Sequence, residues 1–174
     1  MAVVAALVHL LLLGLPWLLT REPWAGVAVL LWVLGSAAAQ DAGPAGPVPR
    51  SEQRRAILLL SVLVVSLVTS TGLHGALAAA GSALLLLGLS LRKAAIRTLG
   101  RHFTAHITTA HSRIHTGPYR WLDHPSELGL ATASLGFAVL CGSAPGMMAW
   151  AAAVVAPSVL RCRAEDRAWA STAS

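Results

Sequence analysis

The sequence predicts an all-α protein, a multi-span transmembrane bundle of about five or six helices. Three observations lead to this prediction. Of the 174 residues, 56% are hydrophobic and only 11% are charged, whereas soluble domains carry roughly 25% charged residues. The hydrophobic residues are gathered into blocks that approach the ~20 residues needed to cross a bilayer. The basic residues fall between alternate blocks, as they do in membrane proteins.

The expected helices follow these apolar blocks along the chain. They cover residues 2–19, 24–39, 56–71, 73–91, 126–141 and 146–160. The first block lacks the basic start and the nearby cleavage site of a secretory signal, so we expect it to be a retained span. The run from Ala56 to Leu91 is too long for one span, and its polar, Gly-containing segment TSTGLHG (69–75) is expected to turn the chain.

The positive charges assign the loops to the two sides of the membrane. With the N-terminus inside, residues 40–55, residues 92–125 and the C-terminal tail are inside, and they hold twelve of the thirteen Lys and Arg residues. Cytoplasmic loops carry such an excess, so we expect a multi-pass cell-membrane protein with its chemically active segment on the cytoplasmic side. This topology also accounts for the net charge of +6, and nucleic acid is not expected as a partner.

Histidines are concentrated in the inside segment 92–125. Five of the seven lie there, and two pairs have the spacing H-x3-H, which places both side chains on one helical face. However, no carboxylate or cysteine completes a zinc pattern. We therefore expect no metal site in this segment, and a solvated histidine-rich loop at His106, His111 and His115.

The more specific signal is TGPYRWLDHPSELG (116–129), which opens the fifth apolar block. Pro125 suits the first turn of a helix and holds His124 extended just before it. Free backbone N–H groups and the positive end of the helix dipole favour an anionic ligand there. A Gly-Pro turn upstream brings Tyr119 and Arg120 toward the same place.

Three segments together resemble the isoprenylcysteine carboxyl methyltransferase family, membrane enzymes that use S-adenosylmethionine and are related in pattern to the phospholipid N-methyltransferases. They are LGRHFT (99–104), GPYRWLDHPSELG (117–129) and RCRAEDRAW (161–169). The usual family forms are close to GR-F-T, GPYR-V-RHPSYLG and R-x-x-x-EE. The resemblance covers roughly residues 90–169. It implies N-terminal transmembrane helices over 1–91 and a methyltransferase-like segment with two C-terminal spans over 92–174.

The resemblance also implies a function and a site. It suggests methyl transfer from S-adenosylmethionine to a hydrophobic or lipid-like acceptor, in a pocket on the cytoplasmic side. His124 and Arg120 are the implied catalytic residues, and Arg161 is the implied substrate-binding residue. The implied cofactor-binding residues are Gly117, Tyr119, Arg120, His124, Pro125, Glu165 and Asp166. If the last two spans form a hairpin, residues 117–125 and 161–166 emerge on one face of the membrane.

Two residues depart from the family pattern and leave alternatives open. Asp123 replaces the usual Arg before the His-Pro pair, and Glu127 replaces the usual Tyr after Pro-Ser. The chain is then either an active methyltransferase or a catalytically degenerate member whose pocket these residues disable. A third alternative is a membrane reductase that uses NADPH, because sterol reductases have a similar His-Pro segment at a helix start. The sequence specifies neither the methyl acceptor nor the oligomeric state.

Overall fold

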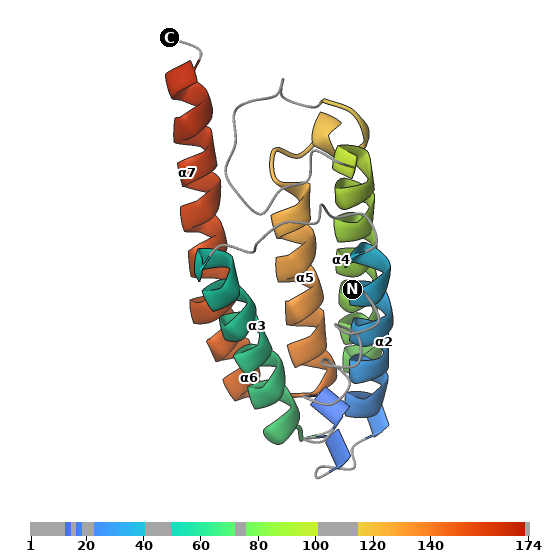
Figure 1. Ribbon diagram of the computed structural model, residues 1–174. Coiled ribbons are helices and arrows are strands. Elements are labelled where there is room, and N and C mark those ends of the chain that lie inside the picture. The colour runs from blue at the N-terminus through green and yellow to red at the C-terminus, as the bar shows by residue number, and fades with distance from the viewer. Residues whose placement is uncertain are drawn as a thin grey trace.

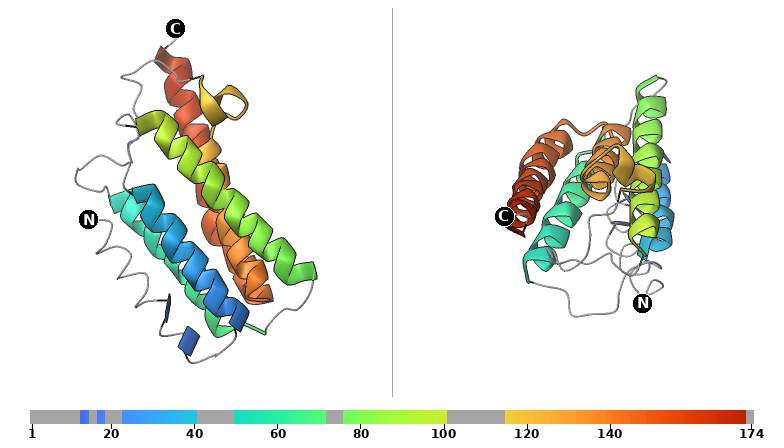
Figure 2. Two further views of the ribbon diagram at one scale, coloured as in Figure 1. Left: turned by 90° about the vertical axis from the view of Figure 1, so that its right-hand side faces the viewer. Right: turned by 90° about the horizontal axis from the view of Figure 1, so that it is seen from above.

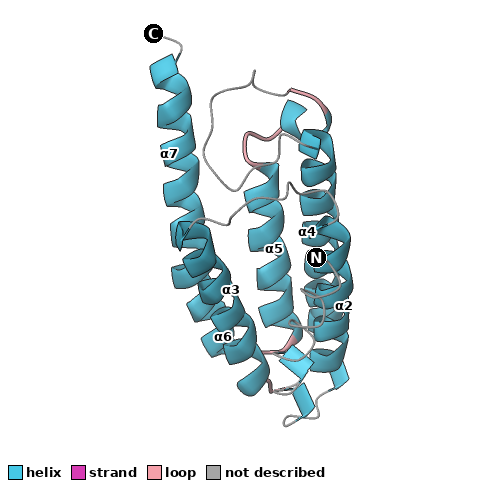
Figure 3. Ribbon diagram, viewed as in Figure 1, coloured by secondary structure: helices cyan, strands magenta, loops and turns pink. Residues whose placement is uncertain are grey.

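The computed structural model describes residues 13–14, 17–18, 23–40, 50–71, 76–100 and 115–172. Every regular element in these ranges is a helix (Figure 3), which confirms the all-α prediction. The elements are α2 (Pro23–Gln40), α3 (Arg50–Val68), α4 (Ala76–Leu99), the 3₁₀ turn η2 (Gly117–Arg120), α5 (Pro125–Leu140), α6 (Ala144–Trp150), the π-helical η3 (Ala151–Val155) and α7 (Ala156–Thr172).

The long helices alternate in direction, as Figure 1 and Figure 2 show. α6, η3 and α7 follow one another without a break and form the second arm of a hairpin with α5. The end of α4, η2, the start of α5 and the C-terminal part of α7 lie at one end of the bundle, here called the site end. The end of α3 and the turn between α5 and α6 lie at the other end, the turn end. This alternation agrees with the predicted order of loops, while the side of the membrane stays a prediction.

Three helices continue beyond their predicted boundaries. α3 begins at Arg50 instead of 56, α4 reaches Leu99 instead of 91, and α7 reaches Thr172 instead of 160. The predicted blocks were too short because apolarity marks only the part of a helix that can lie in hydrocarbon. The added segments are rich in Arg, Lys, Glu, Gln and Ala, which favour helix without being apolar. α4 therefore runs continuously across the expected division at 91–92, and that division stays a prediction.

In the described part of the chain, two helices are long and apolar enough to cross a membrane: Ala76–Leu99, and Ala144–Ala168 through α6, η3 and α7. α5 and the segment Ala25–Leu34 are apolar but shorter. The first expected span, 2–19, lies mostly outside the described residues, so the number of spans stays a prediction. The division of the apolar run 56–91 into two helices is confirmed, because α3 ends at Val68 and α4 begins at Ala76.

α4 and α5 are antiparallel and approach each other closely through glycines. A Cβ added to Gly81 would lie 2.8 Å from the backbone nitrogen of Leu140, and one added to Gly129 would lie 2.6 Å from that of Arg92. Gly88 and Gly136 lie between these contacts and meet the backbone of the opposite helix just as directly. Small residues that allow close backbone approach are the usual basis of helix association in membranes. These glycines therefore fix the position of the start of α5 beside the end of α4.

Hydrogen bonds hold the turn end together. The Thr69 and Ser143 hydroxyls are 2.6 Å apart. The Ser70 hydroxyl donates to the Cys141 carbonyl at 2.7 Å, and the Thr71 hydroxyl donates to the Gly142 carbonyl at 2.8 Å. The end of α3 is therefore attached directly to the α5–α6 turn.

The π-helical segment η3 sets the direction of the side chains on α7. It is followed closely by Pro157, which lacks the N–H that would bond to the carbonyl of Ala153. A π segment is one of the ways in which a helix accommodates such a break. Beyond it, the i, i+3, i+7 spacing places Ser158, Arg161 and Glu165 on one face of α7. This face meets α3 and the start of α5.

We expect Gly88→Ala to lower the midpoint of thermal unfolding of the protein in detergent. The added Cβ would meet the backbone of Ala133, and overpacking costs about 1–3 kcal/mol. Alanine regains only ~1 kcal/mol of helix propensity over glycine. The matched control is Gly14→Ala, because a Cβ there meets no atom of the described residues within 4 Å, and its midpoint should be unchanged or higher. A Gly88→Ala protein as stable as wild type would contradict the close α4–α5 packing.

Candidate functional site

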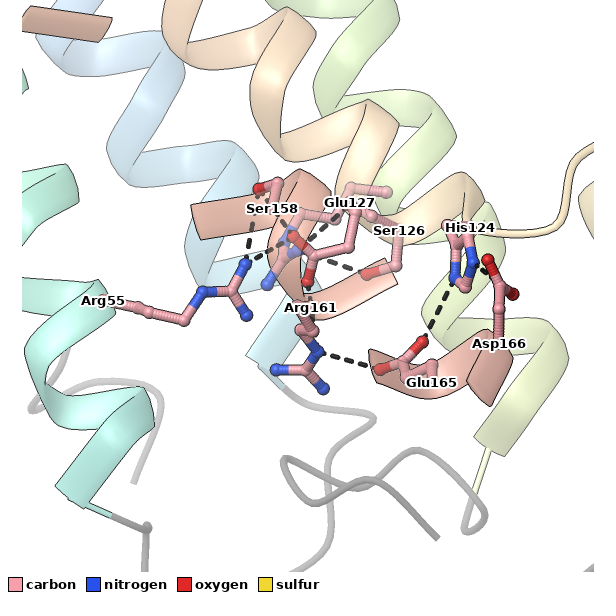
Figure 4. A network of polar contacts seen from close by, with 9 residues as sticks. Arg55, His124, Ser126, Glu127, Ser158, Arg161, Glu165 and Asp166 are labelled. Atoms are coloured by element: carbon pink, nitrogen blue, oxygen red, sulfur yellow. Dashed lines mark hydrogen bonds and ion pairs between the residues drawn. The ribbon is translucent and has the colours of Figure 1, made fainter. Parts of the chain in front are cut away.

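His124 links the start of α5 to α7. It is the N-cap residue of α5 and is followed by Pro125, which is fully buried. The imidazole makes no capping hydrogen bond to its own helix. Instead, its Nδ1 lies 3.1 Å from Glu165 Oε2 and its Nε2 lies 3.2 Å from Asp166 Oδ1 (Figure 4). The two segments that the sequence places on one face of the membrane are therefore in direct contact.

Glu165 also receives a hydrogen bond from its own helix. Arg161 Nε donates to Glu165 Oε1 at 2.9 Å, one helical turn away. Both side chains are about four-fifths buried, with 16% and 22% of their surfaces exposed. Charges at such positions interact more strongly than charges in open water. Arg161 and His124 together hold both oxygens of the Glu165 carboxylate in defined directions.

Glu127 lies in the first turn of α5 and joins three helices. Its Oε2 accepts a hydrogen bond from Arg55 Nη2 of α3 at 2.6 Å and from Ser158 Oγ of α7 at 2.9 Å. Its Oε1 lies 3.7 Å from Arg161 Nε. The glutamate that departs from the family pattern is therefore paired with arginines.

These contacts form one continuous set of charged side chains at the site end. We call it the ion-pair chain, and Figure 4 shows how its members lie. In the order of their contacts, beginning at α3, the members of the ion-pair chain are Arg55, Glu127, Arg161, Glu165, His124 and Asp166. Positive and negative groups alternate as far as Glu165, where the histidine then lies between two carboxylates.

Two further contacts connect α4 to the start of α5 and to η2. The Arg92 guanidinium at the end of α4 donates to both the carbonyl and the hydroxyl of Ser126, each at 3.2 Å. Gly117 opens η2 with a φ of +55°, a conformation that disfavours side chains. A Cβ there would lie 2.6 Å from Thr98 Oγ1. Gly117 is thus required by the backbone and by its contact with α4, apart from any role in binding.

Tyr119 lies in η2 near the same charged groups. Burial, followed by the negative charge of Glu165, raises the pKa of Tyr119 to about 12 from its ordinary value of 10.0. Arg92 acts in the opposite direction and lowers this pKa. The phenol therefore stays protonated at neutral pH and can donate a hydrogen bond.

Arg120 lies apart from the contacts of the ion-pair chain. Its guanidinium carbon is 5.0 Å from the centre of the Trp121 ring, in cation–π geometry. Trp121 is 79% exposed, and Arg120 is exposed beside it. Asp123 is also exposed. Of the predicted site residues, the structure thus brings His124, Arg161, Glu165 and Asp166 into mutual contact, and it leaves Arg120 on the surface of the segment that precedes α5.

Sequence reasoning did not single out Arg55, Arg92 or Ser158. Arg55 is 72 residues from Glu127 and 103 residues from Ser158 along the chain, so no local spacing connects them. One signal was present, because Arg55 immediately precedes an apolar block, where an unpaired charge is unfavourable. His115 is exposed, whereas His102, His106 and His111 lie outside the described residues.

The comparisons with known proteins give one family. Residues 81–171, just over half of the chain, match the isoprenylcysteine carboxyl methyltransferase (ICMT) family. The matched region contains His124, Glu127 and Glu165, whereas Arg55 precedes it. Comparison with curated proteins and with solved structures gives no match.

We expect Tyr119 to titrate with a midpoint near pH 12 instead of 10.0. The chain has one tyrosine, so the ultraviolet absorbance of tyrosinate reports this side chain alone. Glu165→Gln should lower the midpoint but leave it above 10.0, because burial is the larger cause of the shift. Far-UV circular dichroism on the same samples verifies that the helices persist. A midpoint near 10.0 in the folded protein would contradict the burial of Tyr119.

Proposed function

The chain belongs to the isoprenylcysteine carboxyl methyltransferase family, and we propose from this premise that it transfers a methyl group from S-adenosylmethionine to a hydrophobic or lipid-like acceptor. The observation that carries the proposal is the contact of His124 with Glu165 and Asp166. It joins the two segments that the family resemblance assigns to the cofactor, and both lie in the matched region.

The acidic part of the site fits the amino group of S-adenosylmethionine. The carboxylates of Glu165 and Asp166 both lie within contact distance of the His124 imidazole. Two negative charges are therefore close together. Such a pair suits an ammonium group, which offers several N–H donors and a positive charge. We assign Glu165 to the ammonium and His124 to orienting Glu165, with Asp166, at 56% exposure, as the outer acid.

We assign the carboxylate of the amino acid part of S-adenosylmethionine to the start of α5. Backbone N–H groups at a helix N-terminus and the helix dipole favour a carboxylate, and Pro125 begins α5 here. Arg120 is the candidate guanidinium for the same group, and Tyr119 is a candidate donor because its phenol stays protonated. These residues are proposed as binding groups, and Gly117 is proposed to position η2 around them.

When bound, S-adenosylmethionine supplies an electrophilic methyl group on a sulfonium. Transfer to an acceptor requires in-line positioning and exclusion of water more than a strong base. The residues of this chain are therefore proposed to bind, orient and desolvate. Arg161 lies beside both Glu127 and Glu165, and it remains the candidate for contacting a polar group of the acceptor. A lipid-like acceptor would reach the site from the bilayer, between the apolar helices.

The contacts of Glu127 favour an active enzyme over a degenerate one. As an isolated charge, this residue would disturb a nearby cofactor carboxylate. Its carboxylate is instead hydrogen-bonded to Arg55 and Ser158 and lies near Arg161. The departure from the family pattern is thus electrically compensated within this chain.

We place the site end on the cytoplasmic side of the membrane. Each described Lys and Arg belongs to the early turns of α3, the last turns of α4, η2 or the part of α7 from Arg161 onward. These segments gather toward the site end (Figure 1). An excess of basic residues marks the cytoplasmic side.

We expect the purified protein in detergent to bind S-adenosylmethionine saturably in calorimetry. Glu165→Gln and His124→Ala should each weaken binding by about 10-fold or more, because hydrogen bonds to charged groups contribute about 1.5–3 kcal/mol. The control Arg163→Gln changes an exposed residue of the same helix and should leave the affinity unchanged.

The same titration with NADPH discriminates the alternatives. Saturable binding of NADPH without binding of S-adenosylmethionine would favour a reductase. Binding of neither would contradict the proposed function and favour a degenerate family member. Equal affinity of wild type and Glu165→Gln for S-adenosylmethionine would overturn the assignment of Glu165.

A further inference from the structure

Arg55 connects the proposed site to a helix outside the region that defines the family. It belongs to α3, whereas the family match begins at residue 81. Its Nη2 lies 2.6 Å from Glu127 Oε2 and 3.3 Å from Ser158 Oγ. With 20% and 15% of their side chains exposed, Arg55 and Glu127 form a largely buried ion pair. This is the link through which α3 enters the ion-pair chain.

The next link shows how Arg55 can act on Glu165. Arg161 Nε lies between two carboxylates, 2.9 Å from Glu165 Oε1 and 3.7 Å from Glu127 Oε1. The shorter contact determines where Arg161 donates. Glu127 competes weakly for Arg161 because its other oxygen already accepts from Arg55 and Ser158.

Without the Arg55 guanidinium, the balance between the two carboxylates changes. Glu127 would keep Ser158 and Arg161 as its contacts from α7, and its uncompensated charge would attract Arg161 more strongly. In a partly buried setting this attraction exceeds that between the same charges in water. Arg161 would move away from Glu165, and Glu165 would then lose one of the two groups that direct its carboxylate.

A purely structural role for Arg55, attaching α3 to the bundle, is the competing explanation. Contacts at the turn end also attach α3 to the bundle, so this attachment does not depend on Arg55 alone. There, Thr69, Ser70 and Thr71 bond to the α5–α6 turn. α3 also contributes the fully buried Leu63 and Leu67 to the core. Variants at Arg55 should therefore keep the fold.

We propose that Arg55 is a positioning residue of the site, which acts through Glu127 and Arg161 to hold the Glu165 carboxylate beside His124. The proposal rests on the proposed function, in which Glu165 binds the ammonium of S-adenosylmethionine. It makes α3 a working part of the site, although α3 lies outside the family match. Arg55 then affects recognition of the amino acid part of the cofactor and not of its adenosine part.

The first experiment compares two ligands by calorimetry on the full-length protein in detergent. S-adenosylhomocysteine carries the amino acid part, whereas 5′-methylthioadenosine lacks it. We expect Arg55→Met to lower the affinity for S-adenosylhomocysteine about 10-fold, which corresponds to the loss of one hydrogen bond to a charged group. The affinity for 5′-methylthioadenosine should not change. Arg55→Lys should restore most of the affinity. Arg54→Met, at an exposed neighbour in α3, is the matched control and should bind like wild type.

The second experiment needs no ligand and separates this proposal from the proposed function. Midpoints of thermal unfolding are measured for Arg55→Met, Glu165→Gln and the double variant. Because Arg55 and Glu165 act through one series of contacts, the unfolding midpoint of the double variant should fall by less than the sum of the two single decreases. A wild-type protein that binds neither ligand would contradict the proposed function. The unfolding midpoints of the single and double variants would still decide whether Arg55 and Glu165 are coupled. Additive losses, or equal weakening of both ligands by Arg55→Met, would overturn the positioning role.

Discussion

The Glu127 carboxylate joins three helices at one end of the bundle. It lies in the first turn of α5 and accepts hydrogen bonds from Arg55 of α3 and Ser158 of α7. Only 11% of the residues are charged. A charge that is removed from water is strongly destabilising unless it is paired. The arrangement of α3 and α7 around the start of α5 satisfies this requirement. Arg161 lies beside both glutamates, and the proposed coupling of Arg55 to Glu165 rests on this arrangement.

The helices could be read from the sequence because apolar blocks and basic loops follow directly from the energetics of a bilayer. The hairpin of α5 with α6, η3 and α7 was predicted on this basis, and so was the turn that separates α3 from α4. Helix ends were predicted less well, since Arg50 and Thr172 lie in polar segments that remain helical. The contact of α4 with α5 through Gly88 and Gly136 was not predicted. A glycine in an apolar block does not reveal which backbone approaches it.

The site was predicted in part, and the division has a physical cause. His124, Glu165 and Asp166 belong to short motifs whose juxtaposition follows from the hairpin, so family resemblance and topology both indicated them. Arg55 could not be connected to Glu127 because their pairing depends on how α3 packs, and no periodicity encodes a contact over 72 residues. The same pairing changes the interpretation of Glu127. Considered in the motif alone it is a departure from the family, whereas in the folded chain it is balanced by arginines.

Methyl transfer to a lipid-like acceptor at the site end can be measured directly with methyl-labelled S-adenosylmethionine. Membranes from cells with and without the protein are incubated with the labelled cofactor and then extracted with organic solvent. We expect a labelled, solvent-soluble species that requires the wild-type protein and is lost with Glu165→Gln at equal protein level. Its chemical identity would define the acceptor. Identical labelling with and without the protein would contradict methyl transfer by this protein, and full labelling by Glu165→Gln would contradict the role of Glu165 in cofactor binding.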